Sequence, residues 1–227
     1  MTMPAIKDDP WERYYGAGRG QRYPWDSVVA FVFRNATRNR PRSDVRILEV
    51  GCGSGSNLWF AAREGFSVTG IDCSASAIAA ARQRFEADRL AGDLRVGSFL
   101  ELPFPDATFD LAIDRGAITC VGLTDGRRAI DEINRVLRVG GSFLFTPFAW
   151  NHFYAASGTR DADGLVHGIS RGDVVGLGPI CFYRREDIER ALQSGWSIRS
   201  LIHLEQRDYA ADPHDIDAEW RVIATRK

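Results

Sequence analysis

The chain has 227 residues, 44% of them hydrophobic, which is typical of one α/β domain with a sizeable core. Its formal net charge of −1 excludes a global attraction to nucleic acid or to an anionic membrane. The four cysteines show no CxxC pair or zinc-type histidine spacing, and no apolar stretch reaches the ~20 residues of a membrane helix, so we expect a cytoplasmic protein with reduced thiols and without metal.

Residues 45–147 alternate short apolar runs with amphipathic segments, a pattern typical of parallel βαβ units. The predicted strands are 45–50, 67–72, 94–99, 109–114 and 142–148. The predicted helices are 56–65, 74–87, which Ser74 would cap, and 124–141, which Gly140 and Gly141 would end. After a helix at 184–195, two strands at 197–209 and 219–227 favour a terminal antiparallel hairpin. The sequence therefore predicts a doubly wound α/β sheet.

Two segments, 8–25 and 148–180, do not follow this alternation. The first is dense in aromatic residues, arginines and glycines, and its "GAGRG" follows no apolar strand, so we interpret it as a hinge in an aromatic lid. The second is long enough to be a binding loop. Both are expected at the ligand-binding edge of the sheet, where their aromatic rings would favour a dry pocket for a small organic molecule.

The stretch "ILEVGCGSGSN" (47–57) places three glycines in five positions directly after the first predicted strand. In an open α/β sheet this first βα turn is a ligand-binding position. A P-loop is excluded because no lysine follows the glycines. Glu49, two residues before the first glycine, would repel a pyrophosphate and suits a cationic ligand. Asp72 ends the second strand, where its carboxylate could hold a ribose of either a dinucleotide or a methyl donor.

The glycine loop, "VTGIDCS", "GSFLELPFPDATFDLAID" and "INRVLRVGGSFLF" follow one another as the motifs of class I S-adenosylmethionine-dependent methyltransferases do. The chain resembles that family strongly over 45–147 and moderately over 178–198. The resemblance implies a Rossmann-like, doubly wound seven-stranded sheet, mostly parallel with an antiparallel last strand and helices on both faces. We expect a single domain over 1–227, divided into an N-terminal lid and helix (1–44), a cofactor-binding core (45–147), a substrate-side loop (148–183) and a C-terminal helix with a hairpin (184–227).

The resemblance also implies S-adenosyl-L-methionine as the cofactor. The cofactor-binding residues that it implies in the glycine loop are Glu49, Gly51, Cys52, Gly53 and Gly55. The donor's methionyl part would lie over Glu49, Gly51 and Gly53, and Gly55 would let the backbone approach closely. Arg19 or Arg22 of the lid could reach the methionine carboxylate. Asp72 would hold the ribose, and Cys73 would lie against the adenine.

The adenine contact departs from the family pattern, because this chain has "GSF" where many relatives have "GDA". Ser98 could still hydrogen-bond to the base, and Phe99 could pack on it. Asp114, at the end of the fourth strand, would face the methyl region of the donor.

Methyl transfer from a sulfonium is an in-line displacement, in which the enzyme aligns a nucleophile and excludes water. A base assists a hydroxyl more than a neutral amine. The candidates for a catalytic role are Asp114, His152 and His167. "DRGA" at 114–117 is unlike the [DN]PP[YF] of amino-methylating nucleic-acid enzymes, and no basic stripe is present. We expect methyl transfer to a hydroxyl or amine of a small organic acceptor, with a non-catalytic donor-binding protein or an NAD-dependent oxidoreductase as alternatives.

Overall fold

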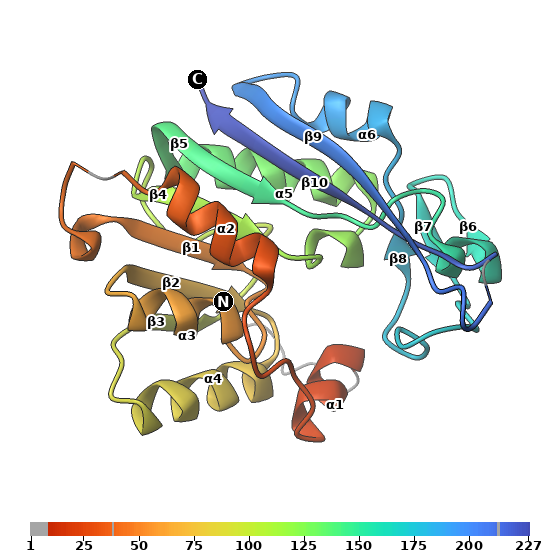
Figure 1. Cartoon of the computed structure of the whole chain (residues 1–227), viewed down its shortest axis with the longest axis horizontal. Helices are drawn as coiled ribbons and strands as arrows, with labels where there is room; N and C mark the ends of the chain where they lie inside the picture. Colours follow the sequence, from red (N-terminus) through yellow and green to blue (C-terminus); the bar gives the residue numbers. More distant parts are fainter. Residues whose placement is uncertain (1–8, 38, 213) are drawn as a thin grey trace.

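The computed structural model describes residues 9–37, 39–212 and 214–227. A seven-stranded sheet runs through the molecule in the order β3-β2-β1-β4-β5-β10-β9 (Figure 1). Its strands are β1 (Arg46–Val50), β2 (Ser67–Asp72), β3 (Asp93–Val96), β4 (Phe109–Asp114), β5 (Leu137–Phe145), β9 (Trp196–Arg207) and β10 (Ile216–Arg226). Strands β1 to β5 pair in parallel, whereas β10 pairs antiparallel with both β5 and β9. The predicted sheet and its terminal hairpin are confirmed.

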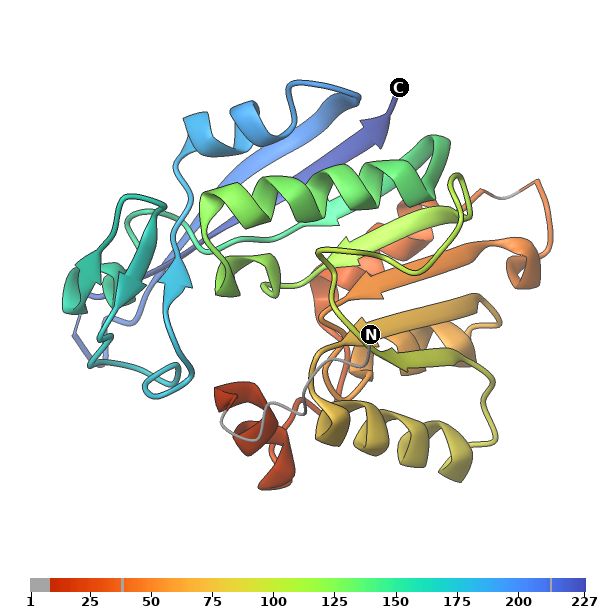
Figure 2. The same ribbon diagram turned by 180° about the vertical axis from the view of Figure 1, so that it is seen from behind.

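Helices cover both faces of this sheet. On one face α2 (Asp26–Asn35), α3 (Ser56–Arg63) and α4 (Ala75–Ala87) bury Val28, Leu58 and Ile78 in one apolar cluster. On the other face α5 (Leu123–Val136) and α6 (Arg185–Ala191) bury Ile130 and Ile188 in a second cluster (Figure 2). Helix α4 begins as predicted, because the Ser74 hydroxyl accepts the backbone N–H of Ala77 at 3.0 Å. In the described part of the chain, every helix is too short or too polar to span a bilayer.

Helix α5 ends earlier than the sequence predicts. The chain leaves the helix after Val136, not at Gly140 and Gly141, and Leu137 already belongs to β5. The cause is tertiary: the loop before β4 donates two backbone N–H groups, from Ala107 and Thr108, to the last turn of the helix at 3.0 and 2.7 Å. With those carbonyls satisfied, Leu137 pairs with the start of β4 instead of continuing the helix.

The two irregular segments contain elements that the sequence did not predict. Near the N-terminus, α1 (Pro10–Gly16) begins after Asp9, whose side chain accepts two backbone N–H groups of the first turn. The long connection forms η3 (Phe153–Ser157) and a small antiparallel sheet of β6 (Thr159–Arg160), β7 (Leu165–His167) and β8 (Ile180–Cys181). Both lie on the side to which the carboxyl ends of the parallel strands point (Figure 1). Residues 1–8 of the expected lid region lie outside the described residues.

Candidate active site

The glycine loop between β1 and α3 has a left-handed backbone at each of its three glycines. Gly51, Gly53 and Gly55 have φ values of 60°, 52° and 73°. A Cβ atom at Gly51 would collide with the Ala117 side chain, and one at Gly53 would collide with the Tyr15 hydroxyl. Glycine is therefore required here both for the backbone conformation and for the close approach of neighbouring groups.

Asp72 fastens this loop to the end of β2. Its Oδ2 accepts the backbone N–H of Gly53 at 2.8 Å, and its Oδ1 accepts that of Ser74 at 2.9 Å. The carboxylate is buried, and burial raises its pKa. Each oxygen keeps a second acceptor direction, so the group can still hold a ligand hydroxyl.

A cavity of about 130 Å³, here called the small cavity, lies beside Asp72 and the glycine loop. It brings together four residues that the sequence assigned to the cofactor, namely Gly51, Asp72, Cys73 and Phe99. The other lining residues are Trp11, Tyr15, Arg115, Gly116, Ala117 and Cys120. Two of these, Trp11 and Tyr15, come from α1, so the N-terminal segment closes one side of this cavity.

Glu49 lies near the end of β1 and is only 2% exposed. Asn57 donates to its Oε1 at 2.6 Å, and Asn57 in turn accepts the backbone N–H of Trp25 at 3.0 Å. The other oxygen, Oε2, has no hydrogen-bond partner. Burial raises the pKa of Glu49 to about 8. A buried carboxyl group with one unpaired oxygen at the glycine loop fits a cationic ligand, as S-adenosylmethionine is.

Asp114 ends β4 and is completely buried. Its Oδ1 accepts the backbone N–H of Ile118 at 2.9 Å, and the backbone N–H groups of Gly116 and Ala117 also donate to its carboxylate. Burial raises its pKa to about 6. Asp114 lines neither the small cavity nor the larger one described below. Its contacts instead fix the turn at 115–120, which borders both.

Arg115 is one of several cavity-lining residues that the sequence did not indicate; Asp173, Asp217 and Glu219 are others. The Arg115 guanidinium lies 2.8 Å from Glu219 Oε2 and 3.9 Å from the ring centroid of Trp25. Arg115 lines the small cavity and also a second cavity of about 390 Å³, here called the large cavity. The available signal was its position directly after Asp114 at the carboxyl end of a central strand, which is where ligand-contacting side chains gather.

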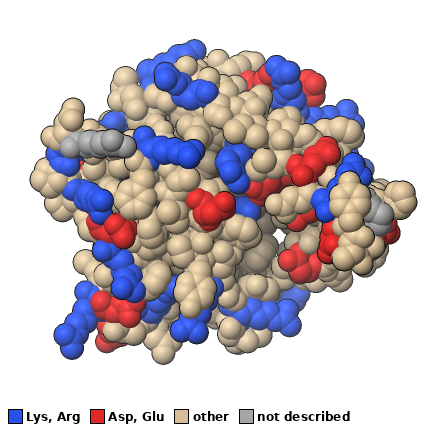
Figure 3. Space-filling view, viewed as in Figure 1, with Lys and Arg blue, Asp and Glu red and all other residues tan. Residues whose placement is uncertain are grey.

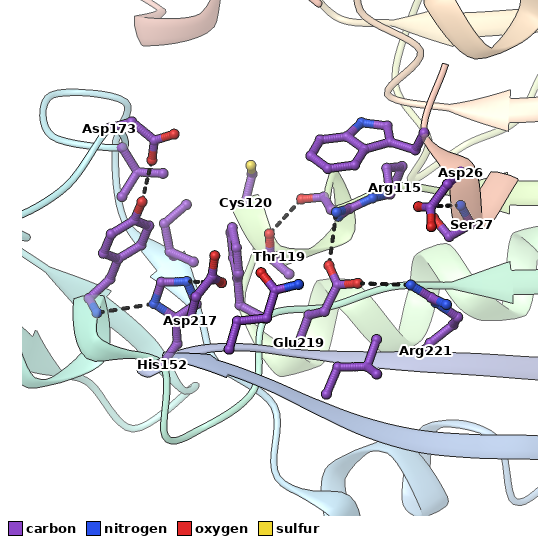
Figure 4. A pocket seen from close by; sticks show the side chains of 18 of the residues that line it. Asp26, Ser27, Arg115, Thr119, Cys120, His152, Asp173, Asp217, Glu219 and Arg221 are labelled. Atoms are coloured by element: carbon purple, nitrogen blue, oxygen red, sulfur yellow. Dashed lines mark hydrogen bonds and ion pairs between the residues drawn. The ribbon is translucent and has the colours of Figure 1, made fainter. Parts of the chain in front are cut away.

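The large cavity lies between the 115–120 turn, the start of α2, the small sheet and the β9–β10 hairpin. Four aromatic side chains line it: Trp11, Trp25, Phe148 and Tyr154. Figure 4 shows Arg115, Glu219 and Arg221 on one side of it and His152, Asp217 and Asp173 on the other. Four residues, Trp11, Arg115, Gly116 and Cys120, line both cavities. The two cavities therefore adjoin at a shared wall.

His152 lines the large cavity and is 2% exposed. Its Nδ1 accepts the backbone N–H of Tyr154 at 3.2 Å, and its Nε2 lies 3.1 Å from Asp217 Oδ1. The ring packs edge-on against Phe148 and stacks with Phe153. Because Nδ1 is an acceptor, Nε2 is the nitrogen that donates to Asp217. This hydrogen bond lowers the pKa of Asp217.

Nine of the candidate residues line neither cavity: Arg19, Arg22, Glu49, Cys52, Gly53, Gly55, Ser98, Asp114 and His167. His167 lies on β7 with its Nε2 2.8 Å from Asp161 Oδ2, and 54% of its side chain is exposed. Arg22 lies over the ring of its neighbour Tyr23, and the Ser98 hydroxyl accepts the backbone N–H of Leu100. Within the described residues, no group of three or more His, Cys, Asp or Glu side chains could hold a metal ion.

Cys52 belongs to the glycine loop but is buried beneath it. It is 7% exposed, and its thiol lies 3.8 Å from the carbonyl oxygen of Gly53. Burial raises its pKa well above the ordinary value, so the thiol is neutral. Its side chain supports the loop from below.

Comparison with known proteins gives a consistent picture. Residues 47–141 match a family model described as a methyltransferase domain. The chain is 32% identical over 139 residues to 24-methylenesterol C-methyltransferase 2 of Oryza sativa subsp. japonica, covering 57% of this chain and 36% of that protein. It is 33% identical over 127 residues to sarcosine/dimethylglycine N-methyltransferase of Aphanothece halophytica, covering 54% and 45%. The chain thus spans less than half the length of these two relatives.

A solved structure of a SAM-dependent methyltransferase from Methanosarcina mazei has a similar fold, with a TM-score of 0.69 and 22% sequence identity. The likeness covers 86% of this chain and 96% of that one.

Proposed function

We propose that this chain, in which residues 47–141 match a methyltransferase domain, transfers a methyl group from S-adenosylmethionine to a hydroxyl or amine of a small organic acceptor. The observation that carries the proposal is the shared wall between the small and the large cavity. In-line displacement requires the nucleophile and the methyl carbon to meet across such a boundary, with water excluded.

The residues of the glycine loop support donor binding. When bound, S-adenosylmethionine supplies an electrophilic methyl group on a sulfonium. Gly51 and Gly53 let the backbone approach the ligand, and Asp72 would accept hydrogen bonds from the ribose hydroxyls. The unpaired oxygen of Glu49 would face the cationic methionyl part. Asp114 would act indirectly, by holding the turn that separates donor from acceptor.

The lining of the large cavity supports a small organic acceptor. Its volume of about 390 Å³ is within the range of small-molecule sites, roughly 300–1,000 Å³. The aromatic walls would exclude water, and His152 would orient the acceptor through Asp217. Arg115 would hold the boundary of the two cavities in place, because Glu219 and Trp25 fix its guanidinium from two sides.

The test is product formation. The protein is incubated with methyl-labelled S-adenosylmethionine and panels of hydroxylated compounds and amines, and labelled product and S-adenosylhomocysteine are quantified. We expect both to form in equal amounts with at least one acceptor, and to be lost in Gly53→Val. Binding of the donor without product from any acceptor would favour a non-catalytic donor-binding protein. Binding of NADH but not of the donor would favour an oxidoreductase.

A further inference from the structure

The large cavity has an uneven distribution of charge. On one side Glu219 is paired with two cations, Arg115 at 2.8 Å and Arg221 at 3.7 Å. On the other side the cavity is lined by the carboxylates of Asp217 and Asp173. The space-filling view shows acidic side chains at the edge of a hollow beside the small sheet (Figure 3).

The hydrogen-bond partners of these two carboxylates are a tyrosine hydroxyl and a histidine ring. The Tyr154 hydroxyl donates to Asp173, and the His152 ring donates to Asp217 at 3.1 Å from Nε2. The Nδ1 of this ring accepts the backbone N–H of Tyr154, so that Nε2 is the nitrogen facing Asp217. The contact with His152 involves Oδ1 of Asp217, which leaves the other carboxylate oxygen, Oδ2, outside it.

His152 holds the Asp217 carboxylate in position at the cavity. The ring is 2% exposed and is enclosed by Phe148, Phe153 and Phe182, with centroid distances of 4.9, 5.1 and 5.9 Å. A polar ring buried among aromatic side chains needs partners for both nitrogens, and the second partner is the carboxylate that lines the cavity. In contrast to the ring, 62% of the Asp217 side chain is exposed.

The same cavity offers aromatic faces for a cation. Trp11, Phe148 and Tyr154 line it together with Asp217. A carboxylate next to aromatic rings is the combination that binds alkylammonium groups, through a charge-assisted hydrogen bond and cation–π attraction. A neutral acceptor would offer no cation to Asp217 and Asp173, and these carboxylates would repel an anionic acceptor.

We propose that Asp217, positioned by His152, binds the amino group of the acceptor, and that the acceptor is an amine. The inference rests on the proposed function and narrows its substrate class. The amine enters as an ammonium and loses one proton to solvent at the exposed edge of Asp217. Its nitrogen lone pair then attacks the methyl carbon, the carbon–sulfur bond breaks with its electrons remaining on sulfur, and the product leaves as a methylated ammonium.

Binding of three matched probes tests the choice of class. They are 2-phenylethylamine, 2-phenylethanol and phenylacetate, which share a ring and differ in charge. Each is titrated calorimetrically into the protein with and without saturating S-adenosylhomocysteine. We expect the amine to bind at least about tenfold more tightly than the alcohol or the carboxylate. Equal affinities, a preference for either of the other two, or no binding of the amine would overturn the proposal.

Matched variants test the role of Asp217. Asp217→Asn should weaken binding of 2-phenylethylamine by about tenfold or more and leave 2-phenylethanol unchanged. Asp131→Asn, on the exposed surface of α5, is the control and should change neither. Unchanged amine affinity in Asp217→Asn would remove Asp217 from the proposal.

The affinity for S-adenosylhomocysteine, measured in the same samples, separates the two proposals. A protein that does not bind S-adenosylhomocysteine contradicts the proposed function. A protein that binds it but shows no preference for the amine contradicts only this inference. With an amine that is turned over, Asp217→Asn should raise KM more than it lowers kcat, because the carboxylate contacts the acceptor before and during transfer.

Discussion

The hydroxyl of Tyr15 occupies the position where a side chain on Gly53 would have to lie. Helix α1 is thus docked directly over the glycine loop, and the Glu12 carboxylate holds it there by accepting hydrogen bonds from the hydroxyls of Ser74 and Ser76 at 2.6 and 2.5 Å. In this arrangement the small cavity measures about 130 Å³, below the roughly 300–1,000 Å³ of most small-molecule sites. Entry of a nucleoside donor therefore requires α1 to move.

Ligand-dependent protection of the N-terminal segment is the first prediction. Residues 9–25 should exchange amide hydrogens rapidly without ligand, because α1 has only seven residues and none of them is fully buried. With S-adenosylhomocysteine they should become protected, since Trp11 and Tyr15 would close over it. Hydrogen exchange detected by mass spectrometry measures this, with α5 as the internal reference. Identical exchange of 9–25 in both states would show that the segment is no lid.

The second prediction is that Gly53→Val weakens binding of S-adenosylhomocysteine by at least about tenfold while the fold is retained. A side chain here needs φ near 52° and displaces the Tyr15 ring. Gly140→Val is the matched control, because Gly140 has φ of 80° but no atom within 4 Å of the position that a Cβ would take. Both variants carry backbone strain, and only the first should lose affinity by calorimetry. Normal binding by Gly53→Val would reduce the loop to a tight turn.

Asp72→Ala should weaken binding of both S-adenosylmethionine and S-adenosylhomocysteine strongly, by about tenfold or more. The change removes the expected ribose acceptor and also releases the Gly53 N–H, which Asp72 accepts at 2.8 Å. Asp93→Ala, on the exposed start of β3, serves as the control and should bind normally. Retention of full affinity in Asp72→Ala, measured by calorimetry, would refute the ribose assignment.

Glu49 should make the stability of the ligand-free protein depend on pH. Its folded pKa of about 8 lies above the ordinary 4.5, so folding favours the protonated form. The stabilisation is complete below pH ~4.5 and is lost as pH rises through about 8, by up to about 1.4 kcal/mol per pH unit. Relative to wild type, Glu49→Gln should thus gain stability with rising pH. Urea denaturation between pH ~5.5 and ~7.5 tests this.

The control for the pH dependence is Glu101→Gln, because Glu101 is exposed. This variant should follow the wild-type slope throughout. Parallel stability curves for wild type and Glu49→Gln would mean that Glu49 is ionised in the folded protein.

His152→Ala should leave the affinity for S-adenosylhomocysteine within about twofold of wild type, because His152 does not line the small cavity. Both ring nitrogens already have partners, so we expect the loss of catalytic efficiency in this variant to appear mainly as a raised KM for the acceptor. A general base would instead cost about 10²-fold in kcat. Steady-state kinetics with an identified acceptor distinguishes these. His167→Ala is the comparison, and its kinetics should match wild type, since His167 lines neither cavity.

Sequence reasoning predicted four residues that the small cavity brings together, because the glycine loop and the strand ends are local patterns. Gly51 and Gly53 lie in one turn, and Asp72 and Asp114 end their strands, so strand topology alone brings them together. The end of α5 was predicted wrongly because its last carbonyls are satisfied by the loop before β4, a contact between segments about thirty residues apart. Helix propensity cannot report such a contact.

The acceptor side was predicted only in outline. The aromatic content of 148–180 indicated a binding region, but β6 and β8 have two residues each, too few for a periodic pattern. The pairing of His152 with Asp217, which lies in β10, joins residues 65 positions apart in the sequence. The position of Arg115 in the site could not be predicted, because it depends on contacts with Glu219 and Trp25. These two residues lie near opposite ends of the sequence.

The shared wall between the two cavities limits how the protein can be altered. A change at Trp11, Arg115, Gly116 or Cys120 alters the lining of both cavities at once. A substitution there that improves the binding of one ligand therefore also alters the binding site of the other. Side chains such as Val174, Ile180, Leu204 and Gln206 line the large cavity alone. Natural divergence towards new acceptors, and laboratory libraries that imitate it, should therefore accumulate substitutions at residues that line the large cavity alone. The residues of the shared wall should stay unchanged.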